Sequence, residues 1–573
     1  MTRRPPPGLR WSLLGLGLSL ASPACGDDTS DGNDPTDATT TTTAGTEPTS
    51  AEGPPTPGDS STSIDPDDST TGAPVTDTGA SSSETGAGDD EPPLLVIESP
   101  RSGATVPVRR VLVTGTVADE QSGLAELAYD GPAGPEAIDV QGDGSFSAAI
   151  EPPPGPSTHH FTATDNAGNT TEVEVDVYFG HRVGVGNSQA AYLREGTLFS
   201  WGRNELGQLG NGTLEGSGWG DDPETSSLPV RYEIEVEDLV SIVTRQTFMV
   251  GLRDDGSVLT WGSGAAGQLG YEANPDCGNS GTSPCSRTPT VVAGLSDVVA
   301  IGAGFEHTLV LDADGMVWTF GDNEYGQLGD PSAPATRMTP TMVPALADII
   351  QVAAASHASY ALTEAGDVYA WGENDRGQLG LGTTDDGANP TPMLVDGLDD
   401  VVQLAAANTT TYALRVDGTV WAWGRNHAGQ AGIGDPSGAD VLEPTMVVDE
   451  AGRPLTDIVA VSGDGFVGLA LDRDGQVHAW GFGFLGQLGQ GYTDGGERDL
   501  EDRVFASPVA VSARQAEAFD ILEIEVGAGG PALALSADGN LFGWGWSFQG
   551  SLGLEGAINA WAYSAPVLVF AAD

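Results

Sequence analysis

Short runs in which apolar and polar residues alternate fill the chain from about residue 181 to its end. Examples are YALRVDGTVWAW (412–423) and LALDRDGQVHAW (469–480), where an Asp-Gly pair separates two alternating runs. This pattern predicts a β-hairpin with a tight turn. A further apolar run precedes the hairpin, as in DVVAIGAG (297–304), and a Pro-led strand such as TPMLV (391–395) opens the unit. The pattern therefore predicts repeated units of four short strands.

A ten-residue marker follows each predicted hairpin. Its copies begin 51 to 64 residues apart and are WGRNELGQLG (201–210), WGSGAAGQLG (261–270), FGDNEYGQLG (320–329), WGENDRGQLG (371–380), WGRNHAGQAG (423–432), WGFGFLGQLG (480–489) and WGWSFQGSLG (544–553). A fixed period of this length is the signature of a repeat architecture. The Trp supplies apolar area for packing between units, and the glycines permit tight turns and close backbone approach.

The marker and the hairpins resemble the regulator of chromosome condensation repeat family. The resemblance covers residues 181–573 and implies an all-β, seven-bladed β-propeller. The eukaryotic nucleotide-exchange members of that family act on a small GTPase and bind chromatin, and no position here justifies carrying over an exchange residue. The family's repeat often places a His in the second strand. Here only His307 keeps it, and we interpret it as a structural histidine.

Ring closure can also be predicted from the repeat. The first unit, VGVGNSQAAYLREGTLFSW (183–201), lacks a Pro-led opening strand. An orphan segment, APVLVF (565–570), follows the last marker. We therefore expect the C-terminal strand to complete the first blade, which would remove the free edges of a half-blade.

Residues 94–180 form a separate predicted module. Alternating runs such as RVLVTGTVAD (110–119) and EVEVDVYF (172–179) are separated by turn residues, which predicts an immunoglobulin-like β-sandwich. The stretch resembles bacterial immunoglobulin-like modules. Asp119, Asp165 and Asn166 are candidate Ca²⁺ ligands, although solvated turns are the favoured interpretation of these residues.

The pattern of the N-terminal residues indicates a targeting segment. Three arginines precede an apolar run, WSLLGLGLSLA (11–21), and Ser22-Pro-Ala-Cys25 follows. This resembles the lipobox of bacterial lipoproteins, with residues 1–25 as signal peptide and Cys25 as the lipidated residue. The alternative is ordinary cleavage after Ala24. Residues 26–93 contain 16 acidic and no basic residues, and we expect a disordered linker.

Composition narrows the function classes. The formal net charge is −60, and all 22 basic residues are arginine, which excludes lysine-dependent chemistry. Nucleic-acid binding needs clustered cations, so the acidity argues against it, and we expect membrane contact only through the lipid anchor. We find no nucleophile motif and no metal-ligand spacing, and we expect neither a catalytic residue nor a cofactor.

The segments after the markers are the candidate binding face. They vary in length, and loops on a rigid scaffold commonly carry binding sites. Cys277 and Cys285 lie in one of these segments and predict a loop-pinning disulfide in an oxidising compartment. The aromatic candidates for the binding face are Trp219, Tyr271, Tyr492, Trp561 and Tyr563.

The leading hypothesis is a monomeric, outer-membrane or cell-surface lipoprotein. In this hypothesis the propeller binds an unidentified protein or glycan without catalysis. A secreted or periplasmic location is the alternative. The competing functions are a polysaccharide lyase or hydrolase with its site in the propeller channel, and a nucleotide-exchange-like activity. The channel hypothesis requires convergent acids or His in the channel.

Overall fold

A computed structural model describes residues 89–132, 134–214, 232–277, 283–483, 486–490, 504–511, 520–528, 530–547, 550–554 and 562–572. The residues from Glu84 onward form one compact unit. The predicted signal peptide, Cys25 and nearly all of the predicted linker lie outside the described residues, as do Trp219, Tyr492 and Trp561. Among the described residues, no helix combines the length and the apolar character needed to cross a membrane.

The first module is a two-sheet sandwich. Its sheets have the orders β1-β3-β6 and β2-β8-β7-β4-β5. The strands are β1 (Leu94–Ser99), β2 (Ala104–Val106), β3 (Val111–Ala118), β4 (Leu124–Gly131), β5 (Gly134–Ala137), β6 (Ser145–Ile150), β7 (Gly155–Asp165) and β8 (Thr170–Phe179). Alternate residues of β3 are buried, and Val113 packs with Phe161 in the core between the sheets. The predicted sandwich is confirmed.

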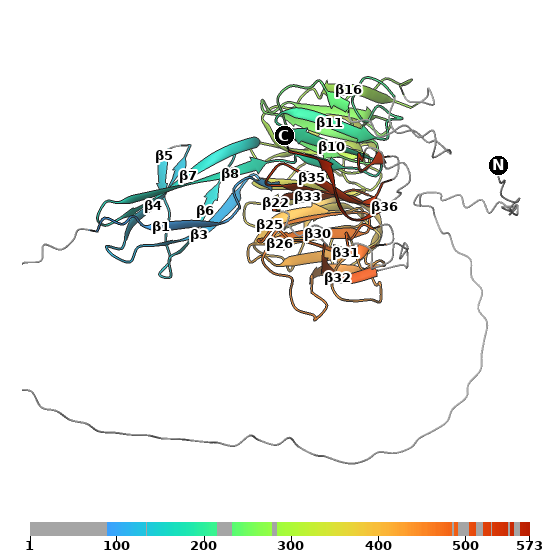
Figure 1. The fold of residues 1–573 in the computed structure, drawn as a ribbon. Coiled ribbons are helices and arrows are strands. Elements are labelled where there is room, and N and C mark those ends of the chain that lie inside the picture. The colour runs from blue at the N-terminus through green and yellow to red at the C-terminus, as the bar shows by residue number, and fades with distance from the viewer. Residues whose placement is uncertain are drawn as a thin grey trace, which may run out of the picture. The chain divides into compact units, whose positions relative to one another are not determined.

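Seven four-stranded antiparallel sheets follow among the described residues, and each is one blade (Figure 1). Blades one to four are β9 (Val183–Val185), β10 (Gln189–Arg194), β11 (Thr197–Gly202), β12 (Tyr232–Ile234); β13 (Leu239–Thr244), β14 (Phe248–Arg253), β15 (Val258–Ser263), β16 (Cys285–Val291); β17 (Val298–Ala303), β18 (His307–Asp312), β19 (Val317–Asp322), β20 (Thr336–Met342); and β21 (Ile349–Ala354), β22 (Ala358–Thr363), β23 (Val368–Asn374), β24 (Asp385–Leu394). Blades five to seven are β25 (Val401–Ala406), β26 (Thr410–Arg415), β27 (Val420–Gly424), β28 (Val441–Met446); β29 (Ile458–Asp464), β30 (Val467–Asp472), β31 (Val477–Phe482), β32 (Val504–Ala510); and β33 (Ile521–Val526), β34 (Pro531–Ser536), β35 (Leu541–Trp546), β36 (Ala562–Phe570). The predicted seven-bladed propeller is confirmed.

Every blade is built from consecutive strands, and this corrects the predicted ring closure. The Pro-led strand follows the marker and pairs with the third strand of its own blade, so it is the fourth strand of that blade. The C-terminal β36 pairs with β35, with Leu541 opposite Phe570 and Gly543 opposite Val567. Blade one has its own fourth strand, β12. The expectation that residues 565–570 complete blade one is therefore wrong, because the repeat boundary lies one strand later than the sequence unit suggested.

Side chains join blade seven to blade one instead of a shared strand. The ring of Phe570 lies 5.5 Å from that of Tyr192, 5.3 Å from that of Phe199 and 5.8 Å from that of Trp201. The Trp201 indole N–H donates to the carbonyl oxygen of Ser551 at 3.0 Å. The outer part of the closing junction thus combines aromatic packing with directed hydrogen bonds, which include one from the Arg194 guanidinium to the Ala571 carbonyl oxygen at 3.3 Å.

The marker's residue types have a shared physical explanation. The indole of Trp261 donates to the carbonyl oxygen of Gln208, in the marker of the preceding blade, at 3.0 Å. A Cβ built at Gly210 would lie 2.8 Å from the Trp261 nitrogen, and Gly210 has φ +74°. The same indole-to-marker bond recurs at Trp371, Trp423, Trp480 and Trp544. The Trp and the last Gly of the marker are therefore two halves of one blade-to-blade contact.

Candidate functional site

The propeller has two chemically different faces. The hairpin face carries the Asp-Gly turns and the starts of the inner strands, as the bond from the Ala313 N–H to the Asp297 carbonyl shows. The marker face carries the marker turns and the turns between the first and second strands, as the bond from the Asp322 N–H to the Glu306 carbonyl shows.

The sandwich module contacts the hairpin face. The Tyr178 hydroxyl donates to the Val240 carbonyl at 2.9 Å, and the Arg109 N–H donates to the Ile350 carbonyl at 3.0 Å. Ion pairs join further blades to the module, namely Arg110 with Glu364, Arg473 with Glu98, and Arg101 with Asp520. These contacts reach blades two, four, six and seven.

A buried polar network lies where the sandwich meets blades seven and one. The carboxylate of Glu523 accepts the Thr105 hydroxyl at 2.8 Å and the backbone N–H groups of Arg182 and Val183 at 2.9 and 3.0 Å. The Arg182 guanidinium donates to Glu523, to Thr105 and to the Gly103 carbonyl. Glu523 is 4 % exposed, so this carboxylate is removed from water and fully occupied.

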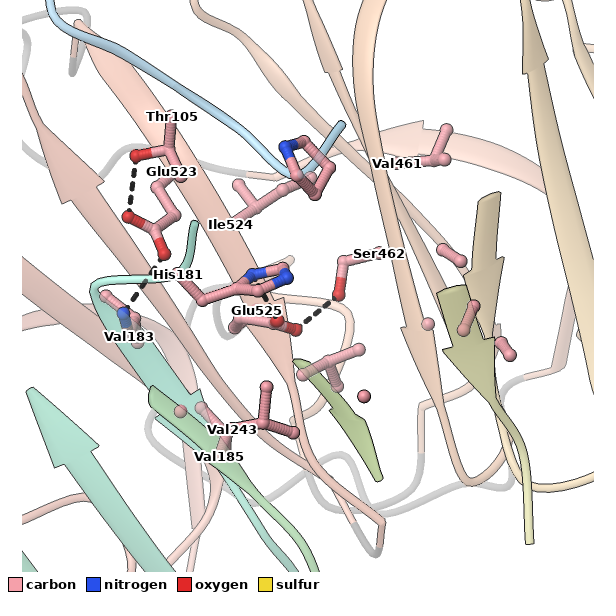
Figure 2. A pocket seen from close by; sticks show the side chains of 18 of the residues that line it. Thr105, His181, Val183, Val185, Val243, Val461, Ser462, Glu523, Ile524 and Glu525 are labelled. Carbon is pink, nitrogen blue, oxygen red and sulfur yellow. Dashed lines mark hydrogen bonds and ion pairs between the residues drawn. The ribbon is translucent and has the colours of Figure 1, made fainter. Parts of the chain in front are cut away.

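The inner strands of all seven blades surround a cavity of 120 Å³. Thr105 and Pro107 of the sandwich module also line it. Most of the lining is small or apolar, as at Val243, Gly302, Ala353, Ala405 and Gly463. Figure 2 shows this cavity with Thr105 and Glu523 at one side and the side chains of His181, Glu525 and Ser462 beside one another.

His181, Glu525 and Ser462 are the chemically distinctive group in this cavity. The Ser462 hydroxyl donates to Glu525 at 2.8 Å, and Nδ1 of His181 lies 3.5 Å from the other carboxylate oxygen. Burial raises the pKa of Glu525, opposed by the nearby His181. The hydroxyl is bonded to the carboxylate and not to the imidazole, so the group lacks the hydroxyl-to-imidazole bond that activates a serine nucleophile.

Arg245 spans the marker-face end of the channel. Its guanidinium donates to the carbonyl oxygens of Ala303 and Ala354 at 2.6 and 2.8 Å and to Asp464 at 2.9 Å. Asp464 is 2 % exposed, and burial raises its pKa against the opposing charge of Arg245. One side chain from blade two therefore bonds blades three, four and six.

Two aromatic clusters lie on the marker face. In the first, the His357 ring lies 4.9 Å from that of Tyr325 and 5.9 Å from that of Phe305. In the second, the Phe466 ring lies 5.1 Å from that of His427, with the guanidinium of Arg425 over it at 5.6 Å. The further ring of the second cluster is Phe482. Half-buried aromatic rings beside charged groups are typical of binding surfaces.

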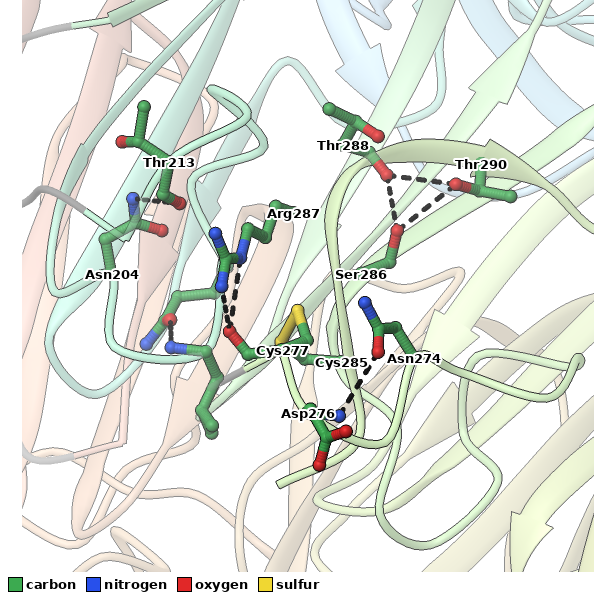
Figure 3. The surroundings of a disulfide bond; sticks show 12 residues. Asn204, Thr213, Asn274, Asp276, Cys277, Cys285, Ser286, Arg287, Thr288 and Thr290 are labelled. Carbon is green, nitrogen blue, oxygen red and sulfur yellow. Dashed lines mark hydrogen bonds between the residues drawn. A yellow bond between two sulfur atoms is a disulfide. The ribbon is translucent and has the colours of Figure 1, made fainter. Parts of the chain in front are cut away.

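The predicted disulfide joins Cys277 and Cys285, whose Cα atoms lie 5.3 Å apart (Figure 3). Cys285 is the first residue of β16, so the bond ties the segment after the second marker to the outer strand of blade two. Nε and Nη2 of Arg287 both donate to the Cys277 carbonyl oxygen, at 3.1 and 2.6 Å. The segment is therefore pinned at both of its described ends.

Two of the five predicted binding-face aromatics are described, and both pack against a blade. The Tyr271 hydroxyl donates to the Thr260 carbonyl at 2.9 Å, and its half-buried ring packs on the core of blade two. Tyr563 is half-buried against the core at the closing junction. The sequence predicts variable segments that run from each marker to the next Pro-led strand, at 271–288, 330–338, 381–390 and 433–443 in blades two to five. The structure shortens these four, because β16, β20, β24 and β28 begin inside them.

The Ca²⁺ candidates of the sandwich module are partly brought together. Carboxylate oxygens of Asp119, Asp165 and Asp89 lie within 4.8 Å of one another. One oxygen of Asp165 accepts three backbone N–H groups of its own turn, and the Asn166 amide nitrogen donates to backbone carbonyls. These bonds are those of a self-capped turn.

His307 is fully buried, as expected of a structural histidine, and it bonds Ser359 of the next blade. Sequence reasoning missed the marker-face clusters, because their turn residues do not share one position: Phe305 lies two residues before its second strand, and His357 and Phe466 lie one residue before theirs. At these two positions blades one, two and five carry Asn, Gln, Ser or Thr. A usable signal existed: an aromatic residue or His one or two residues before the second strand, together with an aromatic residue or His inside a marker.

Comparisons with known proteins found family models that match both modules. A family model for the RCC1-like domain matches residues 162–530, and a model for domain B of glucodextranase matches residues 93–180. Protein pim1 of Schizosaccharomyces pombe is 31% identical over 336 residues, covering 54% of this chain and 60% of pim1. The ultraviolet-B receptor UVR8 of Arabidopsis thaliana is 28% identical over 384 residues, covering 66% of this chain and 79% of UVR8.

Solved structures show the same fold. Human WBSCR16 superposes with a TM-score of 0.54 at 21% identity, covering 66% of this chain and 94% of that protein. Prp20p of Saccharomyces cerevisiae superposes with a TM-score of 0.50 at 22% identity, covering 61% and 81%. The chain spans less than two thirds of pim1 and 5% of the mouse ubiquitin ligase HERC2, so whole-protein activities of these relatives do not follow from the similarity.

Proposed function

The chain belongs to the RCC1-like repeat family, and from this premise we propose that it is a non-enzymatic binding scaffold of the cell envelope. In this proposal the propeller presents its marker face to a partner at the cell surface. The sandwich module, anchored to the hairpin face, links the propeller to the N-terminal linker.

One observation carries the choice of face. The sandwich contacts blades two, four, six and seven on the hairpin face, and Thr105 and Pro107 help to line the channel there. Both aromatic clusters and the marker turns lie on the marker face. Because the hairpin face is engaged by the chain's own module, we expect a partner to bind the turns of the opposite face.

The envelope location rests on the N-terminal sequence. An arginine-rich start, an apolar run and Cys25 support a lipid anchor, and the acidic linker supports a spacer that extends by self-repulsion. We expect Cys25→Ser to move the protein from the membrane to the soluble fraction. Absence of labelled palmitate from the unaltered protein would refute the anchor.

The channel is the alternative site, because it contains a carboxylate and an imidazole at Glu525 and His181. A hydrolase would need these groups to reach a polysaccharide through a channel that Arg245 spans at one end and the sandwich contacts at the other. We expect no release of reducing sugar from envelope polysaccharides. Release that is abolished by Glu525→Gln would establish the enzymatic alternative.

Hydrogen exchange of the full chain tests the scaffold directly. A partner captured from envelope extract should protect the amides of the marker turns 323–326, 374–377 and 426–429. The hairpin turns 312–315, 415–418 and 472–475 are the internal control, because they have equivalent backbone bonds on the other face. Protection confined to the hairpin turns or to the sandwich would overturn the choice of face.

A further inference from the structure

Seven residues of blades three and four form one patch on the marker face, here called the His357 patch. They are Phe305, Glu306, Asp322, Glu324, Tyr325, His357 and Glu373. The patch is tied together by backbone bonds, since the Phe305 N–H donates to Ser356 and the Glu373 N–H donates to His357. Nδ1 of His357 lies 3.3 Å from a Glu373 oxygen, and the ring is held between Phe305 and Tyr325.

Negative charge in this patch exceeds the positive charge available to it. The patch contains four carboxylates and one imidazole, and Glu306 and Glu324 are exposed and form no ion pair among the described residues. Desolvation and the neighbouring charge of Asp322 raise the pKa of Glu306. The whole chain carries 82 acidic and 22 basic residues, so it offers few cations to compensate this excess.

Next to the patch, the buried Nδ1 of His307 also lacks a hydrogen-bond donor. The Ser359 hydroxyl donates to the Gln327 carbonyl at 2.8 Å, so it accepts from Nε2 of His307 at 3.0 Å. Burial lowers the pKa of His307 to about 3, so the ring is neutral and Nδ1 bears a lone pair. His307 is 0% exposed, and its Nδ1 has no partner among the described residues.

Nδ1 of His307 lies against the turn that carries Phe305, beneath the patch. A Cβ built at Gly304 would lie 2.5 Å from Nδ1 of His307 and 2.6 Å from the Ala355 carbonyl oxygen, so the two turns are closely packed there. The unpaired Nδ1 is a further acceptor beneath the patch, and a buried acceptor without a donor costs free energy. At the surface, the carboxylates and the rings call for a group that donates hydrogen bonds and carries positive charge.

We propose that the His357 patch receives an arginine or lysine side chain from a basic segment of a partner protein. This inference rests on the proposed function and names the partner's chemistry. A cation over the Tyr325 and Phe305 rings gains from their quadrupoles, and carboxylates supply charge-assisted acceptors. The matching feature on the partner is a short basic segment, because the acidic surface of this chain steers cations toward it.

Protonation of His357 opposes this binding. Burial disfavours its charged form, but the hydrogen bond and charge of Glu373, with the charges of Asp322 and Glu306, raise the pKa of His357 above its ordinary value. The facing charged groups come from the first turn of blade three, from its marker and from the marker of blade four. Protonated His357 places a cation inside the patch, so a basic ligand binds more weakly as pH falls.

Binding of a labelled oligoarginine peptide to the full chain tests the patch. Glu306→Gln with Glu324→Gln should weaken binding about tenfold at physiological salt. The control is Asp314→Asn with Asp474→Asn, which removes the same charge from exposed hairpin turns of blades three and six. The control should change affinity by less than about twofold. Equal weakening by both pairs would show diffuse electrostatic attraction and overturn the proposal.

The pH profile separates the patch from general acidity. In the unaltered chain, affinity should rise severalfold between about pH 6 and about pH 8, where an imidazole loses its proton. His357→Gln should bind the peptide at the lower pH as tightly as the unaltered chain does at the higher pH. A profile that His357→Gln leaves unchanged would contradict a role for this imidazole.

The same variants separate this inference from the scaffold proposal. Suppose that a captured partner protects the marker turns and that the Glu306→Gln/Glu324→Gln chain still captures it. This result would overturn the proposed role of the His357 patch but would agree with the scaffold proposal. A partner that protects only the hairpin face would overturn both. Melting curves of each variant should match that of the unaltered chain, so that a loss of binding is not caused by unfolding.

Discussion

Junctions between neighbouring inner strands are built in two ways within one propeller. Gln351 donates to the Leu404 carbonyl at 2.9 Å and accepts the Leu404 N–H at 2.7 Å, and Gln403 bonds Val461 in the same two ways at 3.0 and 3.2 Å. At the corresponding place in blade seven, Glu523 accepts the N–H groups of Arg182 and Val183 and binds the Arg182 guanidinium.

The difference follows from what each side chain meets. An amide side chain offers both an N–H donor and a carbonyl acceptor, which match the C=O and N–H of a continuous neighbouring strand. At the closing junction Glu523 meets two N–H groups and a guanidinium of the segment that enters the propeller from the sandwich, and the hydroxyl of Thr105 in β2. Only an acceptor-only group satisfies all of them. The ring therefore closes at the place where the sandwich joins it.

Breaking the junction made by the Glu523 carboxylate should lower the free energy of unfolding the most. Glu523→Leu leaves the Arg182 guanidinium, which is 19 % exposed, without its charge partner and leaves two backbone N–H groups unpaired. We expect the free energy of unfolding to fall by about 3–5 kcal/mol. Urea unfolding measures this change in free energy. A loss as small as that of Gln351→Leu would show that the two kinds of junction are equivalent.

The second-largest loss of stability is expected at the aromatic contacts of the closing junction. Phe570→Ala removes the ring that packs on Tyr192, Phe199 and Trp201 while keeping the backbone of β36. Because Phe570 is only half-buried, we expect a loss of about 2–3 kcal/mol. Leu568→Ala on the same strand is the matched control, since Leu568 is 50% exposed. Similar losses in both would mean that β36 contributes through its backbone alone.

An amide junction should cost less to break. Gln351→Leu leaves the Leu404 N–H and C=O without side-chain partners but strands no charge. We expect a loss of about 1–2 kcal/mol by thermal unfolding. Gln351→Glu sharpens the comparison, because a carboxylate keeps the acceptor but loses the donor. Unchanged stability in Gln351→Glu would contradict the matching of donors and acceptors.

The smallest expected change is an increase in stability, from a substitution at Glu525. The raised pKa of Glu525 means that its charged form is penalised in the folded state. That penalty is absent below the unfolded pKa and grows as pH rises toward the folded pKa. Glu525→Gln should therefore raise stability by roughly 1 kcal/mol at about pH 8 and have little effect at about pH 4. A variant less stable than the unaltered chain at alkaline pH would refute this account.

The seven blades were predictable from local chemistry. The Gly of the Asp-Gly pair in a hairpin turn takes a positive φ, for example Gly315 at +76° and Gly418 at +76°. The alternation around these turns specifies which residues face the neighbouring blades. The Trp and Gly of the marker recur because each blade repeats the same contact with the one before it.

Ring closure was not predictable, because two strand assignments fit the same pattern. A Pro-led segment reads equally well as the first strand of one unit or the fourth strand of the preceding unit. Only the register of β36 on β35 distinguishes the two assignments. The candidate site was missed for a related reason. Phe305, Tyr325 and His357 come from three turns, and each is unremarkable in its own turn.

The sequence by itself determined the repeat, the blade count, the sandwich and the cysteine pair, because these depend on contacts that recur locally or at a fixed period. The tertiary structure alone decided which strand closes the ring, which face the sandwich contacts and which side chains meet around His357. Those outcomes depend on contacts between residues far apart in sequence, such as Thr105 with Glu523 and Arg245 with Asp464. No local pattern predicts such a pairing, since each residue is compatible with its own strand or turn whatever residue it contacts in another part of the fold.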